Sequence, residues 1–187
     1  PTAIIGQNGA GKTTLVKLLK GLLRPEGGVI RFRGEDIAGR TVASLAAQVG
    51  YVFQNPDDQI FRYNVLDEVM FGPLNIGMDE KTAREKSREA LAMTGLAGLE
   101  DRNPYDLELY ERKMVAIASV LAMDPDVLIL DEVLGLVEQG IVSAEEVHEL
   151  LGEASDTTEL IFTGIKLCPE MMDWADDVYQ ITALKES

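Results

Sequence analysis

Apolar residues recur along the chain with two spacings, and these spacings predict alternating strands and helices. Short continuous apolar runs are typical of buried strands, whereas apolar residues three or four positions apart are typical of helices. Runs of the first kind occur at 2–5, 29–34, 48–54, 126–130 and 157–164. Segments of the second kind occur at 12–23, 79–95, 106–123 and 140–154. Strands that alternate with helices favour an α/β fold with a mostly parallel sheet covered by helices.

Residues 62–123 interrupt this alternation because they are mainly helical. A first helix there is supported by an acidic first turn, by Glu80 and Arg84 four residues apart, and by Gly95 as a stop signal. Neither an internal repeat nor a low-complexity linker divides the chain. We therefore predict one domain, with the following division: a core formed by 1–61 and 125–187, and a helical subdomain at 62–124.

Two adjacent carboxylates, Asp131 and Glu132, directly follow the apolar run at 126–130. A carboxylate at the end of a buried strand faces a large desolvation cost, which pushes it toward its neutral form unless a partner compensates. The pair therefore indicates a nearby cation or a reacting water.

The stretch GQNGAGKTT, residues 6–14, fits the phosphate-binding pattern G-x-x-x-x-G-K-[ST]. It lies between a predicted strand and a predicted helix, which is the context that the pattern needs. Glycines let the backbone turn with positive φ and approach a phosphate closely, and the helix N-terminus adds its positive dipole end. We predict that ATP is bound by Gly6, Asn8, Gly9, Ala10, Gly11, Lys12, Thr13 and Thr14.

Residues of this loop would bring cations close to the acid pair, namely the Lys12 ammonium and the Mg²⁺ ion. Lys12 can reach the β and γ phosphates, and the Thr13 hydroxyl can hold Mg²⁺. In P-loop proteins an acid at the end of a neighbouring strand holds the same metal, a role that suits Asp131, and the next acid, Glu132, is placed to polarise an attacking water. We therefore predict Mg-ATP as the ligand and Glu132 as the catalytic residue. The alternative is that the acid pair only caps the following segment.

Composition narrows the class of protein. The chain has 187 residues, 46% of them hydrophobic, which is enough for one domain with an ordinary core. Its net charge of -15 argues against non-specific nucleic-acid binding, since phosphate backbones need clustered cations. No apolar run approaches the ~20 residues that span a bilayer, and the first residues lack the pattern of a secretory signal. The single cysteine, Cys168, is interpreted as a partly buried apolar residue.

Taken together, these residues resemble the ATP-binding subunits of ABC transporters over almost the whole chain. The matching motifs are Walker A at 6–13, a Q-loop in YVFQNPDDQIF and Walker B in VLILDE. The sequence around Gln54 and in VLDEVMFGPLNIGM is most similar to that of ATPases of energy-coupling-factor type, which serve cobalt, nickel and vitamin importers. The resemblance implies a RecA-like P-loop NTPase fold, ATP and Mg²⁺ as cofactors, and Gln54 as a contact to Mg²⁺ and to the catalytic water.

The resemblance also implies partners and a location. The partners would be a second ABC-type ATPase subunit, in a homodimer or a heterodimer, and an integral membrane transport subunit to which Gln54 would couple. The location would be the cytoplasm, on the inner face of the cell membrane. No nucleic-acid partner is expected, because DNA-repair ATPases of ABC type carry long coiled-coil insertions for which residues 54–107 leave no room.

The chain departs from the family pattern most clearly at the signature motif. The expected Leu-Ser-Gly-Gly-Gln aligns with LELYE, residues 107–111. Its glycines let one subunit's helix end touch the γ-phosphate bound to the other subunit, and here Leu109 and Tyr110 place side chains in that gap. Glu108 adds a carboxylate, which at ~5 Å from a phosphate costs on the order of 3 kcal/mol per unit of opposing charge. Acids in a first helical turn nevertheless stabilise that helix, so DLELYE predicts a sound helix start.

Three further departures concern the other family motifs. After Walker B the segment VLGLVE is one residue short of the family pattern, and Val137 stands where the D-loop aspartate is expected. Gly164 replaces the switch histidine, and the only histidine, His148, is interpreted as a surface or packing residue. Finally, five residues precede Gly6, whereas family members usually carry two or more strands upstream, including an aromatic that stacks on adenine.

These observations lead to one hypothesis and two alternatives. The leading hypothesis is an ATP-binding, weakly hydrolysing subunit that resembles those powering membrane import of metal ions or vitamins. The first alternative is a nucleotide-binding regulatory module without hydrolysis, which the joint loss of the signature, the D-loop acid and the histidine favours. The second is a degenerate fragment without stable function.

Overall fold

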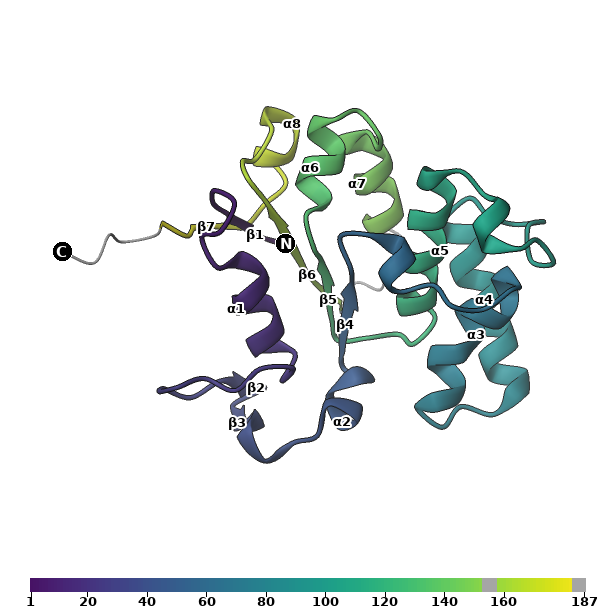
Figure 1. Cartoon of the computed structure of the whole chain (residues 1–187), viewed down its shortest axis with the longest axis horizontal. Coiled ribbons are helices and arrows are strands. Elements are labelled where there is room, and N and C mark those ends of the chain that lie inside the picture. The colour runs from purple at the N-terminus through teal and green to yellow at the C-terminus, as the bar shows by residue number, and fades with distance from the viewer. Residues whose placement is uncertain (153–157, 183–187) are drawn as a thin grey trace.

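A five-stranded parallel sheet organises the chain in the computed structural model, which describes residues 1–152 and 158–182 (Figure 1). Its strands are β1 (Thr2–Ile5), β4 (Val49–Val52), β5 (Val127–Leu130), β6 (Glu159–Gly164) and β7 (Asp177–Gln180). Their order is β4-β5-β6-β1-β7, and each neighbouring pair is parallel. The carboxyl ends of all five strands therefore point to one edge, where the loop after β1 and the acids after β5 both lie.

Helices cover both faces of this sheet. The helices of the described chain are α1 (Lys12–Leu19), α2 (Val42–Ala46), α3 (Val65–Asn75), α4 (Glu80–Met93), α5 (Leu109–Leu121), α6 (Val133–Glu138), α7 (Ala144–Gly152) and α8 (Pro169–Met172). Of these, α3 and α4 pack against α5 rather than against the sheet (Figure 1). A small antiparallel pair, β2 (Arg31–Phe32) and β3 (Glu35–Asp36), lies beyond the end of α1 (Figure 1). Short 3-10 turns occur at Ile37–Gly39, Pro56–Asp58 and Pro104–Asp106.

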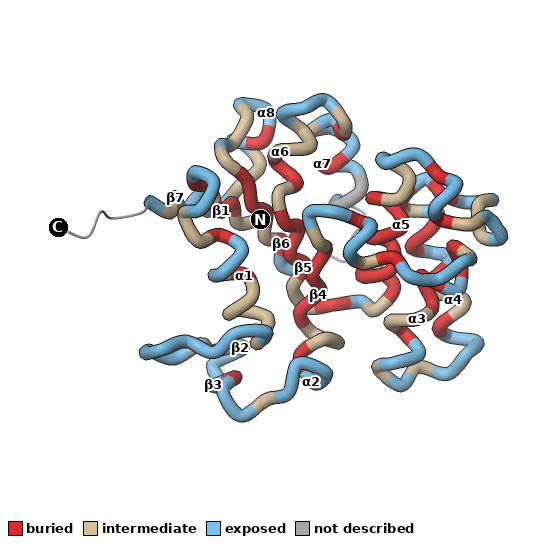
Figure 2. The backbone as a smooth tube through the Cα atoms, viewed as in Figure 1, coloured by how far each residue is buried: buried red, intermediate tan, exposed pale blue. Residues whose placement is uncertain are grey.

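The strands separate two hydrophobic clusters because successive side chains point to opposite faces of a sheet. Val49, Tyr51 and Ile129 face α1 and pack with Val16. The alternate residues Val52, Leu128, Leu130, Leu160 and Phe162 belong to the larger cluster on the other face, together with residues of α3 to α8. Figure 2 shows this buried backbone running from the strands into α5 and its neighbours. The helical segment therefore shares its core with the sheet, and the proposed division at 62–124 stays a prediction.

Local signals explain the helices of this segment. Asn64 and Asp79 cap α3 and α4 by accepting hydrogen bonds from backbone amides of the first turn. Glu80 and Arg84 form the expected ion pair at 3.2 Å, and Gly95 follows α4 with φ 72°. These features agree with the sequence prediction.

Several element boundaries differ from the prediction. The helix expected from residue 106 begins at Leu109, because Leu107 is extended and Pro104–Asp106 forms a separate 3-10 turn. The strand expected at 29–34 is only Arg31–Phe32. The strand β7 was not predicted, because all four of its residues are exposed and carry no apolar pattern. The helices α2, α6 and α8 were not predicted either. In the part of the chain that the structure describes, we find no helix with the length and apolar content needed to cross a membrane.

Candidate functional site

The loop between β1 and α1 has the geometry of a phosphate cradle. Gly9 and Gly11 adopt left-handed backbone conformations, with φ of 81° and 100°, and a side chain at either position would meet open space. At Gly6 the space is what requires glycine, because an added Cβ would lie 2.6 Å from the Ile181 carbonyl oxygen. Gly11 also precedes the first turn of α1, so the loop presents the N-terminal end of that helix.

A cavity of about 360 Å³ opens above this loop and collects most of the predicted site residues. Its lining consists of Asn8, Gly9, Gly11, Lys12, Thr13, Thr14, Gln54 and Glu132. Gly6 and Ala10 instead border a separate cavity of about 300 Å³ beside Ile181. Residues from three distant parts of the sequence therefore converge where strand ends of an α/β sheet meet, which is the usual place for a ligand in such folds.

Lys12 is the charged centre of this cavity. Its side chain is only 5% exposed, and its ammonium donates hydrogen bonds to the carbonyl oxygens of Gly6 and Gln7 at 2.8 and 3.4 Å. It also forms an ion pair with the Glu132 carboxylate at 3.0 Å. The lysine of the loop and the acid after β5 are thus in direct contact.

Asp131 lies beneath the cavity, with hydroxyl partners on both neighbouring strands. The Tyr51 hydroxyl donates to Asp131 Oδ2 and the Thr163 hydroxyl donates to Asp131 Oδ1, each at 2.7 Å. Burial and the adjacent carboxylate raise the pKa of Tyr51 well above its usual value, so this phenol stays a donor at neutral pH. An ionised carboxylate has about four acceptor sites, so two oxygens with one hydrogen bond each keep capacity for a metal.

These oxygen donors fit Mg²⁺, which takes oxygen ligands and commonly uses one or two carboxylates together with substrate phosphates. Thr13 and Gln54 lie on the cavity wall, whereas Asp131 is only 2% exposed and does not line the cavity. The hydroxyl of Thr13, the amide oxygen of Gln54 and the Asp131 carboxylate are the groups that would hold the ion. Their roles as ligands stay predictions.

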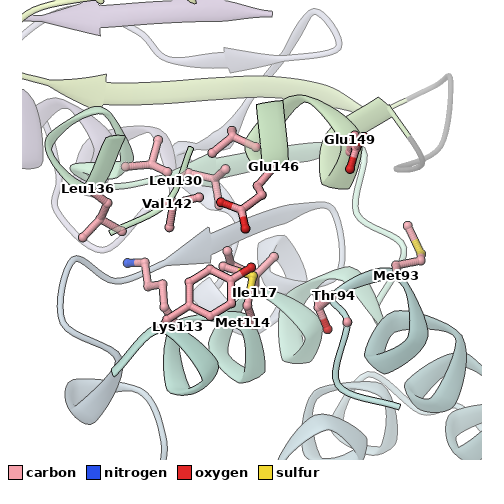
Figure 3. A pocket seen from close by; sticks show the side chains of 14 residues that line it. Met93, Thr94, Lys113, Met114, Ile117, Leu130, Leu136, Val142, Glu146 and Glu149 are labelled. Carbon is pink, nitrogen blue, oxygen red and sulfur yellow. The ribbon is translucent and has the colours of Figure 1, made fainter. Parts of the chain in front are cut away.

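Lys113 of α5 is a second buried cation close to the site. Its ammonium donates to the carbonyl oxygens of Phe53 and Gln54 at 2.5 and 3.0 Å, and so it fixes the backbone where Gln54 leaves β4. Burial lowers the pKa of Lys113 to about 8, while Asp131 acts in the opposite direction. Lys113 also borders a second cavity of about 200 Å³ between α5 and α7, where Figure 3 shows it with Leu136, Val142 and Glu146.

The backbone at Glu132 is in an uncommon conformation. Glu132 has φ 56° and ψ 23°, the left-handed region that non-glycine residues avoid at a cost of ~1–3 kcal/mol. The turn lets the chain leave β5 and begin α6 at once, with the Glu132 side chain directed to Lys12. Strain of this kind persists only where surrounding contacts impose it.

The start of α5, where the signature motif is expected, is organised differently. Glu108 precedes the helix in an extended conformation, and its amide donates to Glu111 Oε2 at 2.9 Å. Arg112 donates to the Leu107 carbonyl at 2.6 Å and pairs with Asp57 at 3.1 Å. The segment is therefore a well-capped helix start, as predicted, with Leu109 and Tyr110 at the positions of the expected glycine pair and the carboxylates of Glu108 and Glu111 on either side of them.

Gly164 lies at the end of β6, where the switch histidine is expected. A Cβ added there would lie 2.4 Å from Leu134 Cβ on α6, so no side chain fits without movement of that helix. His148 lies elsewhere, exposed on α7, with its ring 4.6 Å from that of Trp174. Val137 is half-buried within α6, and the single cysteine, Cys168, is half-buried before α8.

Comparison with known proteins agrees with this geometry. The family model described as ABC transporter matches residues 1–135. The chain belongs to the ABC transporter family. It is 44% identical over 172 residues to an ABC transporter ATP-binding protein of Pyrococcus horikoshii, covering 91% of this chain and 66% of that one. It is also 44% identical over 174 residues to the energy-coupling factor transporter ATP-binding protein EcfA of Methanoculleus marisnigri, covering 92% of this chain and 63% of that one.

A solved structure of a related protein has the same fold as this chain. CbiO1 from Clostridium perfringens, part of the ABC transporter complex CbiONQ, superposes with a TM-score of 0.80 and 37% identity, covering 96% of this chain and 72% of that one. The predicted P-loop NTPase fold and the family resemblance are confirmed. The chain spans less than two thirds of the length of the two sequence relatives named above.

Three residues of the site were missed by sequence reasoning: Tyr51, Lys113 and Thr163. Tyr51 and Thr163 lie within apolar runs that were interpreted only as strands, and Lys113 lies within a helix that was interpreted only by its apolar face. A polar residue one position before a strand ends, as in LIFTG, is the available signal for Thr163.

Proposed function

We propose that this chain is the ATP-binding subunit of an ABC transporter and that it binds Mg-ATP in the 360 Å³ cavity above the β1–α1 loop. The observation that carries the proposal is the convergence of the loop, Gln54 and Glu132 around the buried Lys12 ammonium. A loop of left-handed glycines at a helix N-terminus recognises phosphate, and a lysine inside it recognises the terminal phosphates.

Within this proposal, each residue has a distinct task. Lys12 exchanges its contact with Glu132 for the β and γ phosphates, which leaves the Glu132 carboxylate free to orient and polarise a water. The bound Mg²⁺ would neutralise charge on those phosphates, and Thr13, Gln54 and Asp131 would hold it. Lys113 keeps Gln54 in place by binding its carbonyl oxygen.

We further infer that the transporter is an importer of energy-coupling-factor type, with a membrane subunit and a second ATPase subunit as partners. The names of two similar proteins support this: EcfA is an energy-coupling factor transporter ATP-binding protein, and CbiO1 is part of the complex CbiONQ. Such assembly would place the chain in the cytoplasm, at the inner face of the membrane. We infer a heterodimer because the carboxylates at the start of α5 suit a phosphate poorly, so that a partner with an intact signature would complete this chain's site.

Thermal melting with and without Mg-ATP tests nucleotide binding. A ligand at 100 times its dissociation constant adds about 2.7 kcal/mol to the free energy of unfolding. We expect that gain in the wild type and its loss in Lys12→Ala. Lys17→Ala is the matched control, because Lys17 lies on the same helix but does not line the cavity, and its gain should equal that of the wild type. A melting temperature of the wild type that is the same with and without Mg-ATP would overturn the proposal.

Turnover is tested separately by mixing the chain with an ATPase subunit whose signature is intact. We expect the ATP turnover of the mixture to exceed the sum of the separate rates, and Glu132→Gln in this chain to remove the excess. A rate unchanged by mixing and by Glu132→Gln, together with retained binding, would instead identify a nucleotide-binding module without hydrolysis.

A further inference from the structure

We propose that Thr163 is a positioning residue that fixes Asp131 and Glu132 relative to each other and thereby sets the affinity of the site for Mg²⁺. The inference rests on the proposed function, because it assigns to Thr163 a part in the same Mg-ATP site. Thr163 is fully buried on β6, and its side chain contacts the two acids through a single hydroxyl group.

The direction of both hydrogen bonds follows from the groups involved. The backbone amide of Glu132 can only donate, so it donates to Thr163 Oγ1 at 2.8 Å. The hydroxyl proton then points to Asp131 Oδ1 at 2.7 Å, where an ionised carboxylate can only accept. One hydroxyl therefore acts as acceptor for one acid's backbone and as donor to the other acid's side chain.

The backbone explains why a side chain is needed here. β5 pairs with β6 up to Leu130 and Phe162, and the next amide, that of Asp131, donates to the Val52 carbonyl on β4 at 3.1 Å. The Glu132 residue then turns into the left-handed region, and its amide no longer lies in the sheet. Thr163 accepts from that amide in place of a strand carbonyl, and so it holds the turn that directs Glu132 to Lys12.

Tyr51 provides a useful comparison, since it contacts only one of the acids. Its hydroxyl donates to Asp131 Oδ2 from β4, on the opposite side of the carboxylate from Thr163. Loss of the Tyr51 hydroxyl would loosen Asp131 alone, whereas loss of the Thr163 hydroxyl would loosen Asp131 and the Glu132 turn together. The two residues therefore separate a general loosening of Asp131 from the coupling that we assign to Thr163.

Outer partners of metal ligands typically change metal affinity by about 10–100-fold when they are removed. The test is the Mg²⁺ concentration that gives half of the ATP-induced melting shift, measured at fixed ATP in the full chain. For Thr163→Val, which keeps the shape of the side chain and loses the hydroxyl, we expect this concentration to rise by about 10-fold or more. Thr163→Ser should restore the wild-type midpoint, and Tyr51→Phe should raise it less than Thr163→Val does.

A second measurement separates this role from a merely structural one. The melting shift produced by ATP in the presence of a chelator reports the loop and Lys12 without the metal, and it should be equal in the wild type and in Thr163→Val. An unchanged Mg²⁺ midpoint in Thr163→Val, or a failure of Thr163→Ser to restore it, would overturn the role of Thr163 while Mg-ATP binding by the wild type still stands. No shift with Mg-ATP in the wild type would overturn the proposed function as well. Should Thr163→Val not melt cooperatively, Thr163→Ala, which also lacks the hydroxyl, takes its place with the same expected outcomes.

Discussion

Two regions of the molecule hold their carboxylates with different kinds of partner: the strand-end site, with Asp131 and Glu132, and the start of α5, with Glu108 and Glu111. At the strand ends, Asp131 is buried and receives hydroxyl donors from two neighbouring strands, while Glu132 faces the ammonium of Lys12. At the start of α5, Glu108 is exposed and Glu111 accepts from a backbone amide of its own helix. The first arrangement uses long-range partners that only the folded sheet brings together, and the second uses partners three residues apart.

This difference separates a site that depends on the folded sheet from a helix start that depends on its own neighbouring residues. The buried Asp131, Lys12 and Lys113 are costly to place without partners, so the hydrogen bonds that each of them makes favour a maintained site. At the start of α5 the Glu111 carboxylate instead accepts from a backbone amide three residues away. Under the proposed function, the chain would bind a nucleotide with its own loop and would need another subunit to complete the site.

The largest difference between the two regions is expected when the buried acid, Asp131, is removed. Asp131→Ala leaves the hydroxyls of Tyr51 and Thr163 without an acceptor, at a cost of about 1–3 kcal/mol each. We therefore expect a fall of several degrees in the melting temperature, measured without nucleotide. Glu108→Ala removes an exposed acid and should change the free energy of unfolding by no more than ~0.5 kcal/mol. Equal losses in the two variants would show that the two regions do not differ as described.

The pH dependence of stability tests the buried cation of the same site. Burial lowers the pKa of Lys113 in the folded chain to about 8, against about 10.4 when it is unfolded. Below pH 8 both states carry the charge, and the folded state bears the full desolvation penalty. Between pH 8 and about 10.4 the unfolded state binds more protons, so this residue's contribution to the free energy of unfolding rises with pH, by at most about 3 kcal/mol.

The measurement is the difference in free energy of unfolding between the wild type and Lys113→Met from pH 7 to 10. The variant removes this titration while Lys20, whose pKa burial also lowers to about 8, still titrates in both proteins. We expect the difference to move in favour of the wild type as the pH rises above 8. A constant difference would mean that Lys113 titrates alike in the folded and unfolded states.

A smaller effect is expected on the far side of the acid pair, where β6 meets α6. Gly164→Ala places a Cβ 2.4 Å from Leu134 Cβ, and such overpacking costs about 1–3 kcal/mol. In a Leu134→Gly background the Cβ atom that the added methyl would meet is absent, so the two changes should be less costly together than the sum of their separate effects. Gly27→Ala is the control, since its Cβ would meet nothing within 4 Å. Additive losses in denaturant unfolding would contradict the contact.

The sequence predicted local features well and the long-range ones only in part. The strand at 2–5, the glycine loop and the acids after 126–130 were predicted because each is a contiguous pattern with its own physical cause. Tyr51 and Thr163 were not, because their partner Asp131 is 80 and 32 residues away and only the order of the strands brings them together. β7 was missed because an exposed strand lacks the apolar pattern on which the prediction depends.

The smallest loss in the free energy of unfolding is expected at the cap of α5, the second of the two regions compared. Glu111→Ala removes the carboxylate that accepts from the Glu108 amide, and caps of this kind contribute about 0.5–2 kcal/mol. We expect the low end of that range, because Glu108 is exposed and water can replace the lost acceptor. Glu111→Gln keeps an acceptor oxygen and should lose less, as measured by denaturant unfolding. A loss as large as that of Asp131→Ala would mean that the start of α5 depends on buried partners, as the strand-end site does, and that its carboxylates are more than local caps.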